Sequence, residues 1–161
     1  NGQLRSKRNY KIGIKDGLWE EYNDNGQLKF KRNYKDGIKD GLWEEYHDNG
    51  RLRSKGTYKN GIRDDLWEEY NDNGQLRSKR NYKDGKQDGL WEEIFDTGQL
   101  SFRGNYKESK KDGPWKYYNR FPYHLILKGN YKDGKKDGLW ELYDLWGRIK
   151  KENYVYGVKI D

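Results

Sequence analysis

The chain of 161 residues contains no cysteine and no methionine, and only 31% of its residues are hydrophobic. Without cysteine there is neither a disulfide framework nor a thiolate metal site. That absence fits any compartment, so a cytoplasmic and a secreted location both stay open. No apolar run approaches the roughly 20 residues that a membrane-spanning helix needs, and we find no signal peptide.

Charged residues make up 38% of the chain, a proportion that usually accompanies disorder. The aromatic side chains oppose this, because Trp, Tyr and Phe make up 16% and recur in phase. One well-buried Trp removes roughly 150–250 Å² from water, or about 4–6 kcal/mol at most. Such an anchor in every short unit offsets much of the ordering entropy, so we expect a folded chain.

A tryptophan returns at a fixed interval. Trp19, Trp43, Trp67, Trp91 and Trp115 are 24 residues apart, and Trp140 follows 25 later. A period in this range is typical of a repeat architecture. We therefore predict one repeat array over 1–161, with a partial unit at 1–15 and Trp-bearing units at about 16–39, 40–63, 64–87, 88–111, 112–136 and 137–160. Because no distinct capping unit is visible at either end, we expect the chain to be a piece of a longer protein.

Each unit has the pattern of a β-hairpin. A short aromatic stretch, Leu18–Tyr22, precedes the turn signal Asn23-Asp24-Asn25-Gly26, and Gln27–Tyr34 then alternates, with Leu28 predicted to share a face with Phe30. A three-residue loop with Gly26 in the left-handed conformation predicts that Tyr22 lies opposite Leu28.

The same register predicts Glu21 opposite Lys29 and leaves the burial of Trp19 unexplained. A bulge near Gly17 or lateral packing on the next hairpin would bury it, and the sequence does not decide between them. Lone hairpins are marginal in water, so each must pair with its neighbours. The predicted fold is all-β: an elongated repeat solenoid of stacked antiparallel β-hairpins that forms a continuous twisted sheet, with little or no helix.

The units resemble the MORN repeat (membrane occupation and recognition nexus), most closely its bacterial variant. The matching positions are Tyr34, Gly37, Gly41, Trp43, Tyr46, Gly50 and Leu52, and again Tyr82, Gly85, Gly89 and Trp91. The resemblance implies stacked hairpins and roles in scaffolding, protein association or contact with acidic lipids. Some bacterial members look like antitoxin components or secreted surface proteins. A weaker similarity, to choline-binding cell-wall repeats, rests on Trp115-Lys116-Tyr117-Tyr118 alone, where Lys116 would repel a quaternary ammonium.

The chain departs from the pattern at a few positions. Asp65 replaces the glycine before Trp67, Ile94 replaces a tyrosine and Ser109 replaces a linker glycine. The largest change is Asn119–His124, which stands in place of Asn-Asp-Asn-Gly-Gln and adds one residue.

Catalytic chemistry finds little support, so we predict that the chain is not an enzyme and binds no cofactor or metal. The two histidines, His47 and His124, lie in separate turns. Paired glutamates such as Glu20-Glu21 recur in every early unit, and adjacent strand residues point to opposite faces, which favours cross-strand pairing with Lys or Arg. The Asp-Gly steps are interleaved with lysine and are read as turns rather than as calcium loops.

The net charge of +7 is concentrated in one region. Residues 101–136 hold ten Lys or Arg and three acids, which accounts for all of it. Altered turns on a regular scaffold often carry function, although repeat drift would give the same pattern. The candidate partner-binding residues are Lys116, Tyr117, Tyr118, Arg120, Phe121, Tyr123 and His124, with the aromatic residues as anchors and Arg120 as a hot spot.

A basic, aromatic patch of this kind suits the acidic surface of another protein best. Association with acidic membrane lipids and neutralisation of a toxin are the alternatives. Nucleic acid is disfavoured, because outside 101–136 the acids equal the bases and interrupt any positive stripe. Exposed sheet edges or stack ends also favour self-association.

Overall fold

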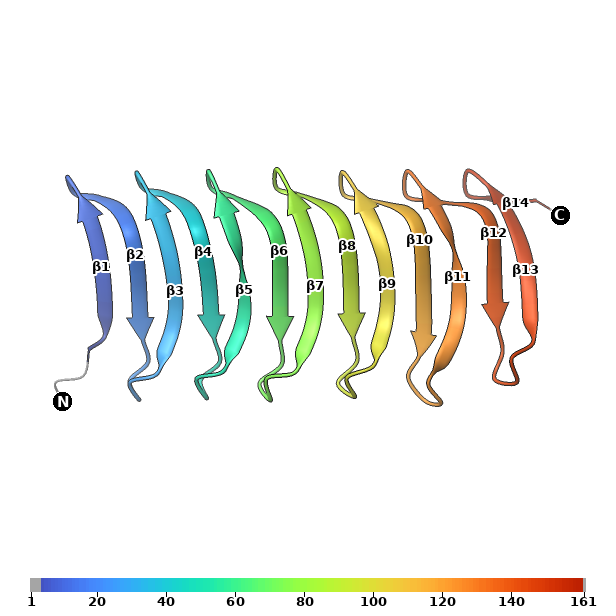
Figure 1. Cartoon of the computed structure of the whole chain (residues 1–161), viewed down its shortest axis with the longest axis horizontal. Coiled ribbons are helices and arrows are strands. Elements are labelled where there is room, and N and C mark those ends of the chain that lie inside the picture. The colour runs from blue at the N-terminus through green and yellow to red at the C-terminus, as the bar shows by residue number, and fades with distance from the viewer. Residues whose placement is uncertain (1–3, 161) are drawn as a thin grey trace. The chain divides into compact units, whose positions relative to one another are not determined.

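The computed structural model describes residues 4–160, and within that range the chain forms only β-strands and turns. Fourteen strands follow one another in chain order in a single open antiparallel sheet (Figure 1). The strands are β1 (Ser6–Lys11), β2 (Ile14–Tyr22), β3 (Leu28–Lys35), β4 (Ile38–Tyr46), β5 (Leu52–Lys59), β6 (Ile62–Tyr70), β7 (Leu76–Lys83), β8 (Lys86–Ile94), β9 (Leu100–Lys107), β10 (Lys110–Asn119), β11 (His124–Lys132), β12 (Lys135–Tyr143), β13 (Ile149–Val155) and β14 (Val158–Ile160). The predicted all-β fold of successive hairpins is confirmed.

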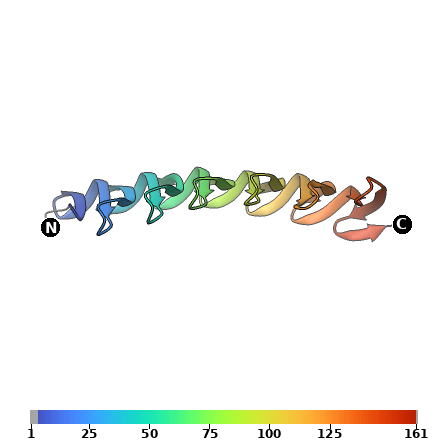
Figure 2. The same ribbon diagram turned by 90° about the horizontal axis from the view of Figure 1, so that it is seen from below.

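Contacts divide the sheet into two compact units, which are described separately. Unit 1 comprises residues 4–76 and 82–85, and unit 2 comprises residues 77–81 and 86–160. In both units the strands are curved, as the view from below shows (Figure 2). No helix that could span a membrane occurs between residues 4 and 160.

The turn Asn23-Asp24-Asn25-Gly26 joins β2 to β3. The Gly26 amide donates a hydrogen bond to the Asn23 carbonyl (2.9 Å), and the Asn23 amide donates one to the Gln27 carbonyl (2.8 Å). Gly26 has a φ of +82°, which glycine adopts at little steric cost. Tyr22 lies opposite Leu28, so the predicted three-residue loop is confirmed.

One pair further from this turn, the predicted register is wrong. Glu21 lies opposite Phe30 and not opposite Lys29, because Lys29 is the extra residue of a β-bulge. The bulge also places Leu28 on the face of Tyr22 and Phe30 on the other face, so the predicted shared face of Leu28 and Phe30 is wrong as well. The Lys29 ammonium still reaches the Glu21 carboxylate, at 3.4 Å.

The two Asp-Gly steps of each linker have different roles. Asp36-Gly37 forms the two-residue turn between β3 and β4, with φ values of +48° and +82°. The second step lies inside β4, where Gly41 has a φ of +95° beside an irregularity in the pairing with β3. The Asp40 carboxylate accepts a hydrogen bond from the Asn60 amide in the following turn, at 3.1 Å. The predicted turn at Asp36-Gly37 is confirmed, whereas the predicted turn at Asp40-Gly41 is wrong, because this step lies within β4, from which Asp40 holds the following turn.

Two of the substituted glycine positions keep the glycine conformation. Asp65 has a φ of +60° and Ser109 a φ of +65°. The backbone of the repeat is thus set by its neighbours even where the residue type resists it.

All six repeat tryptophans lie on one side of the sheet, which we call the indole face. In unit 1 they alternate with tyrosines in a file, Tyr10, Trp19, Tyr34, Trp43, Tyr58, Trp67 and Tyr82, with successive ring centroids 5.0–6.4 Å apart. In unit 2 the file is Trp91, Tyr106, Trp115, Tyr131, Trp140 and Tyr154, at 5.0–6.5 Å. The open question about Trp19 is answered by the bulge near Gly17, beside which the ring stands. The lateral packing is not on the next hairpin, since the ring lies between Tyr10 of the preceding strand and Tyr34 of its own hairpin.

The indole N–H groups of the repeat tryptophans are held in two ways. Gly104 lies opposite Trp115, and the indole covers it and donates to the Asn105 carbonyl, at 3.0 Å. Arg32 lies opposite Trp43, and there the indole N–H donates instead to Glu45 on its own strand, at 3.3 Å. Trp19 also faces an arginine, Arg8, but its indole N–H donates to the Asn9 carbonyl at 3.0 Å, so the opposite residue alone does not determine the arrangement. The repeats therefore share one backbone and use two side-chain arrangements.

Candidate protein-binding site

The side of the sheet opposite the tryptophans, which we call the ladder face, carries a row of charged residues, one from each of strands β1 to β6 in unit 1 and β8 to β13 in unit 2. In unit 1 the sign alternates without exception along successive Cα partners: Lys7, Glu20, Lys31, Glu44, Lys55 and Glu68. The Lys55 ammonium lies 2.8 Å from the Glu68 carboxylate, and this hydrogen bond raises the pKa of Lys55. Opposite charges directly across a ladder favour pairing, so the row helps to hold the strands in register.

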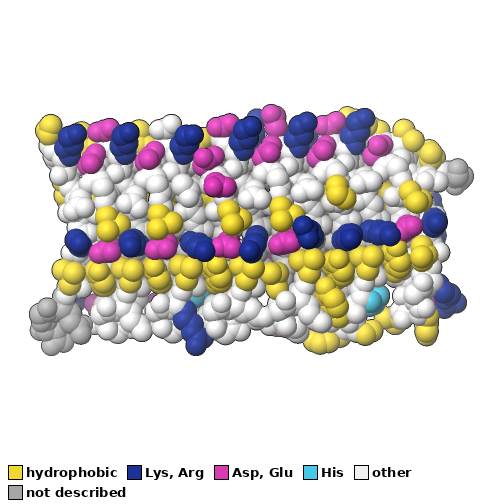
Figure 3. All heavy atoms as spheres, in the orientation of Figure 1, with side chains coloured by type: hydrophobic (Ala, Val, Ile, Leu, Met, Phe, Trp, Pro, Cys, Tyr) yellow, Lys and Arg dark blue, Asp and Glu magenta, His cyan; other side chains and the backbone are white. Residues whose placement is uncertain are grey.

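In unit 2 the alternation breaks. The row there runs Glu92, Arg103, Lys116, Lys128, Glu141 and Lys151. Lys116 stands where a glutamate would continue the pattern, between two other cations. Figure 3 shows this row, in which dark-blue and magenta side chains alternate until several dark-blue ones come together. We call Arg103, Lys116 and Lys128 the cation row. With strands about 4.8 Å apart, it spans about 10 Å between its outer Cα atoms.

The two outer members of the cation row have partners of their own. Arg103 lies 3.5 Å from the Glu92 carboxylate, and Lys128 lies 2.6 Å from that of Glu141. The hydrogen bond to Glu141 raises the pKa of Lys128. Lys116 is exposed and forms no ion pair with any residue between 4 and 160. Its ammonium is therefore the member of the row that is available to an external carboxylate.

Two tyrosines adjoin the cation row on the ladder face. Tyr118 follows Lys116 by two residues on β10, and its ring stacks on that of Tyr123, with centroids 5.5 Å apart and an interplanar angle of 7°. In the four other Trp-bearing units that keep the equivalent tyrosine, it donates to the glutamate two residues before it, as Tyr46 does to Glu44 at 2.9 Å. Lys116 offers no such acceptor, so the Tyr118 hydroxyl is not engaged in that way.

The enlarged turn extends from the end of β10 to the start of β11. Arg120 forms an ion pair with Asp96, and its guanidinium lies 5.1 Å from the centroid of Phe121. Phe121 is 68% exposed and precedes a cis peptide bond to Pro122. The His124 Nδ1 lies 2.7 Å from the Pro122 carbonyl. The turn thus presents an exposed aromatic ring, while the charge of Arg120 is partly satisfied within the chain.

One predicted site residue lies on the other side. Tyr117 is on the indole face, where its ring stacks on Trp115 at 5.7 Å and its hydroxyl accepts a hydrogen bond from the Lys111 ammonium at 2.8 Å. Burial of the ring is the main cause that raises the pKa of Tyr117, and the hydrogen bond with Tyr131 adds to it. Tyr117 and Lys116 therefore cannot contribute to one surface, because adjacent strand residues point to opposite faces.

Sequence reasoning missed the two outer members of the cation row as site residues. Arg103 and Lys128 count toward the basic region 101–136, but nothing in the local sequence singles them out. Their repeat phase carries a signal, since Lys31, Lys55, Lys79, Arg103 and Lys128 are spaced by 24 or 25 residues. Register across three strands is needed to see that Lys116 lies between them.

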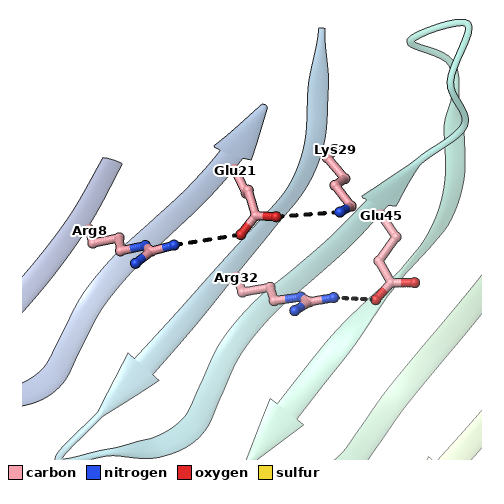
Figure 4. A network of polar contacts seen from close by, with 5 residues as sticks. All are labelled: Arg8, Glu21, Lys29, Arg32 and Glu45. Carbon is pink, nitrogen blue, oxygen red and sulfur yellow. Dashed lines mark hydrogen bonds and ion pairs between the residues drawn. The ribbon is translucent and has the colours of Figure 1, made fainter. Parts of the chain in front are cut away.

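The second glutamate of each pair lies on the indole face and is also used internally. In unit 1, Glu21 bridges Arg8 and Lys29, at 3.7 and 3.4 Å, and Arg32 lies 2.7 Å from Glu45 (Figure 4). Burial tends to raise the pKa of Glu45, but hydrogen bonds from Arg32 and Trp43 outweigh it and lower the pKa. The paired glutamates therefore serve opposite faces as ion-pair partners, and no group of potential metal ligands gathers anywhere in residues 4–160.

A sheet made of in-phase hairpins, with aromatic rings in file on one face and charges in a row on the other, defines an open β-repeat scaffold. A model of the MORN repeat variant matches residues 15–36, 39–60, 66–84 and 87–108, which together exceed half of the chain. The chain belongs to this family of MORN repeats, and the resemblance seen in the sequence is confirmed. The family is typically non-catalytic. No curated protein matches the chain.

Proposed function

We propose that the protein is a non-enzymatic scaffold that binds an acidic segment of another protein at the cation row. The observation that supports this is the break, at Lys116, in the row of alternating charges on the ladder face. In unit 1 every cation of the row faces carboxylates on the neighbouring strands, whereas Lys116 faces only Arg103 and Lys128. Like charges directly opposite are destabilising, so a carboxylate from a partner would relieve a repulsion that the fold itself leaves in place.

The dimensions of the patch favour a local protein segment over an extended polyanion. The cation row spans about 10 Å and ends at Glu92 and Glu141, which would repel a continuing chain of phosphates. A flat anionic membrane would also meet the alternating charges that flank the row, whose attraction and repulsion offset each other. Tyr118, Tyr123 and Phe121 add aromatic contact area beside the charges, as is common at the centre of protein interfaces.

The test uses a substitution that restores the pattern of unit 1. Lys116→Glu places a carboxylate between Arg103 and Lys128, as Glu44 lies between Lys31 and Lys55. We expect this variant to fold and to lose binding to a fluorescent glutamate-rich peptide, measured by anisotropy at low salt. Lys59→Glu is the matched control, because it makes the same charge change at an exposed position of β5 outside the cation row. Equal affinities of Lys116→Glu and Lys59→Glu would refute the proposal.

A second comparison identifies natural partners and distinguishes protein binding from the alternative, binding to acidic lipid. The wild-type chain and both variants are used as bait in the native organism, and the expected partners are those lost with Lys116→Glu and kept with Lys59→Glu. Sedimentation with phosphatidylserine vesicles is measured in parallel. Vesicle binding that depends on Lys116, together with absent peptide binding, would favour acidic lipid over protein.

A further inference from the structure

The indole face carries a repeated cation position. A Lys or Arg at the start of an even-numbered strand lies over the tryptophan four residues later and over the next tyrosine of the file. Its charged group stands 4.2–4.5 Å from the Trp centroid and 4.7–5.5 Å from the Tyr centroid. The residues are Lys15, Lys39, Arg63, Lys111 and Lys136. These distances are those of cation–π contacts, so each cation caps two rings at once.

One unit lacks this cation. Gln87 occupies the position, four residues before Trp91 and 24 before Lys111. The two rings that a cation would cap are nevertheless in place, since the Trp91 and Tyr106 centroids lie 5.0 Å apart. An amide carries no charge and therefore provides no cation–π contact to either ring.

The exposure of Trp91 agrees with a missing cap. Trp91 is the one repeat tryptophan that is only half-buried, whereas the other five are at most 9% exposed. Trp91 keeps one cation, Arg80, at 4.9 Å from its centroid. In the two units that have an arginine at the same place, a lysine accompanies it: the rings of Trp19 and Trp43 each hold both cations.

We propose that the Trp91–Tyr106 pair is a binding site for the ammonium group of a lysine side chain on a partner polypeptide. The chain itself indicates the ligand, because four of the five equivalent positions are filled by a lysine ammonium. The charge of Arg80, the cation already on the Trp91 ring, is offset by Glu93, which accepts the Trp91 indole N–H at 3.2 Å and lies 3.6 Å from Arg80. This site is on the indole face, and so it is independent of the cation row.

The test follows the indole N–H resonance of Trp91 in a nitrogen-15-labelled chain, assigned by its loss in Trp91→Phe. The probe is n-butylammonium chloride, which has the alkyl length and charge of a lysine side chain. Sodium chloride controls for ionic strength, and n-butanol controls for the alkyl group. We expect a saturable shift of the Trp91 resonance with butylammonium, at concentrations where butanol and sodium chloride cause none.

Two variants at position 87 make the test specific. Gln87→Lys fills the position from within the chain and should abolish the shift, while Gln87→Ala leaves it open and should retain it. A shift that persists unchanged in Gln87→Lys, or that is equal for all indoles, overturns the proposal. Tetramethylammonium is titrated in parallel, and a stronger response to it would replace lysine by a quaternary ammonium as the ligand.

Discussion

The indole of Trp115 lies directly over the α-carbon of Gly104 on the neighbouring strand, and a Cβ atom at that position would overlap the ring. Trp115 is 1% exposed, so the ring has no free space into which it can retreat. Gly104→Ala should therefore lower the free energy of unfolding by about 1–3 kcal/mol, as overpacking does in other cores. Urea denaturation followed by tryptophan fluorescence measures this. Ser101→Ala, on the same strand, adds no atom and should be close to neutral; equal midpoints for the two variants would contradict the proposed contact.

The turn within each hairpin, which Gly50 closes between β4 and β5, can be tested separately. Gly50 has a φ of +80°, in a region that β-branched residues resist. Gly50→Val should cost about 1–2 kcal/mol of unfolding free energy, whereas Gly50→Asn should cost less, because asparagine tolerates left-handed backbone. Thermal denaturation of the two variants side by side tests this, and a Val variant as stable as the Asn variant would show that the turn does not constrain position 50.

The cation position on the indole face can be tested in unit 1, where it is filled. The Lys39 ammonium lies 4.5 Å from the Trp43 centroid and 4.7 Å from that of Tyr58. Lys39→Gln should destabilise the chain by about 0.5–1 kcal/mol and Lys39→Arg should be tolerated. Lys35→Gln, an exposed change on the preceding strand, is the control for loss of charge. If Lys39→Gln and Lys35→Gln have the same melting temperature, the cap contributes nothing.

The ionisation of the Tyr46 hydroxyl should make the stability of the chain depend on pH in the alkaline range. Burial, together with its hydrogen bond to Glu44, raises the pKa of Tyr46 from 10.0 to about 12. The folded chain thus holds the proton more tightly than the unfolded chain does. This contribution is fully present below pH 10 and is lost as the pH rises toward about 12. The unfolding free energy of the wild type should fall more steeply over that range than that of Tyr46→Phe. Parallel slopes from urea denaturation would show that Tyr46 ionises normally.

The sequence predicts the hairpins and their turns, because glycines at fixed intervals mark the backbone positions with positive φ. The sequence does not predict the β-bulge beside the turn at Gly26, since an extra residue such as Lys29 leaves no trace in the alternation of polar and apolar side chains. For the same reason the predicted face of the Leu28 side chain is wrong. The sequence also leaves the cause of the burial of Trp19 undecided.

The candidate site shows the same limit. Lys116 stands out in the sequence because a lysine replaces a repeated glutamate. Its neighbours Arg103 and Lys128 do not, because their proximity depends on the register of three strands. Tyr117 is predicted to share a surface with Lys116, yet alternation on β10 separates the two, which a count of local charge and aromatic residues cannot detect.

The charge ladder leads to a prediction about stability as well as binding. Lys116→Glu converts two like-charge neighbours, Arg103 and Lys128, into opposite-charge ones, and restores the order seen in unit 1. The urea midpoint of this variant should rise at low ionic strength by a small amount, because exposed pairs are weak. The gain should shrink as salt is added, since the Debye length falls from about 30 Å at 0.01 M to about 3 Å at 1 M. Lys59 lies outside the row of alternating charges, so the urea midpoint of Lys59→Glu should rise less. A midpoint for Lys116→Glu that is lower than the wild type at 0.01 M salt would mean that the three cations do not repel one another, and that a partner's carboxylate has no repulsion to relieve.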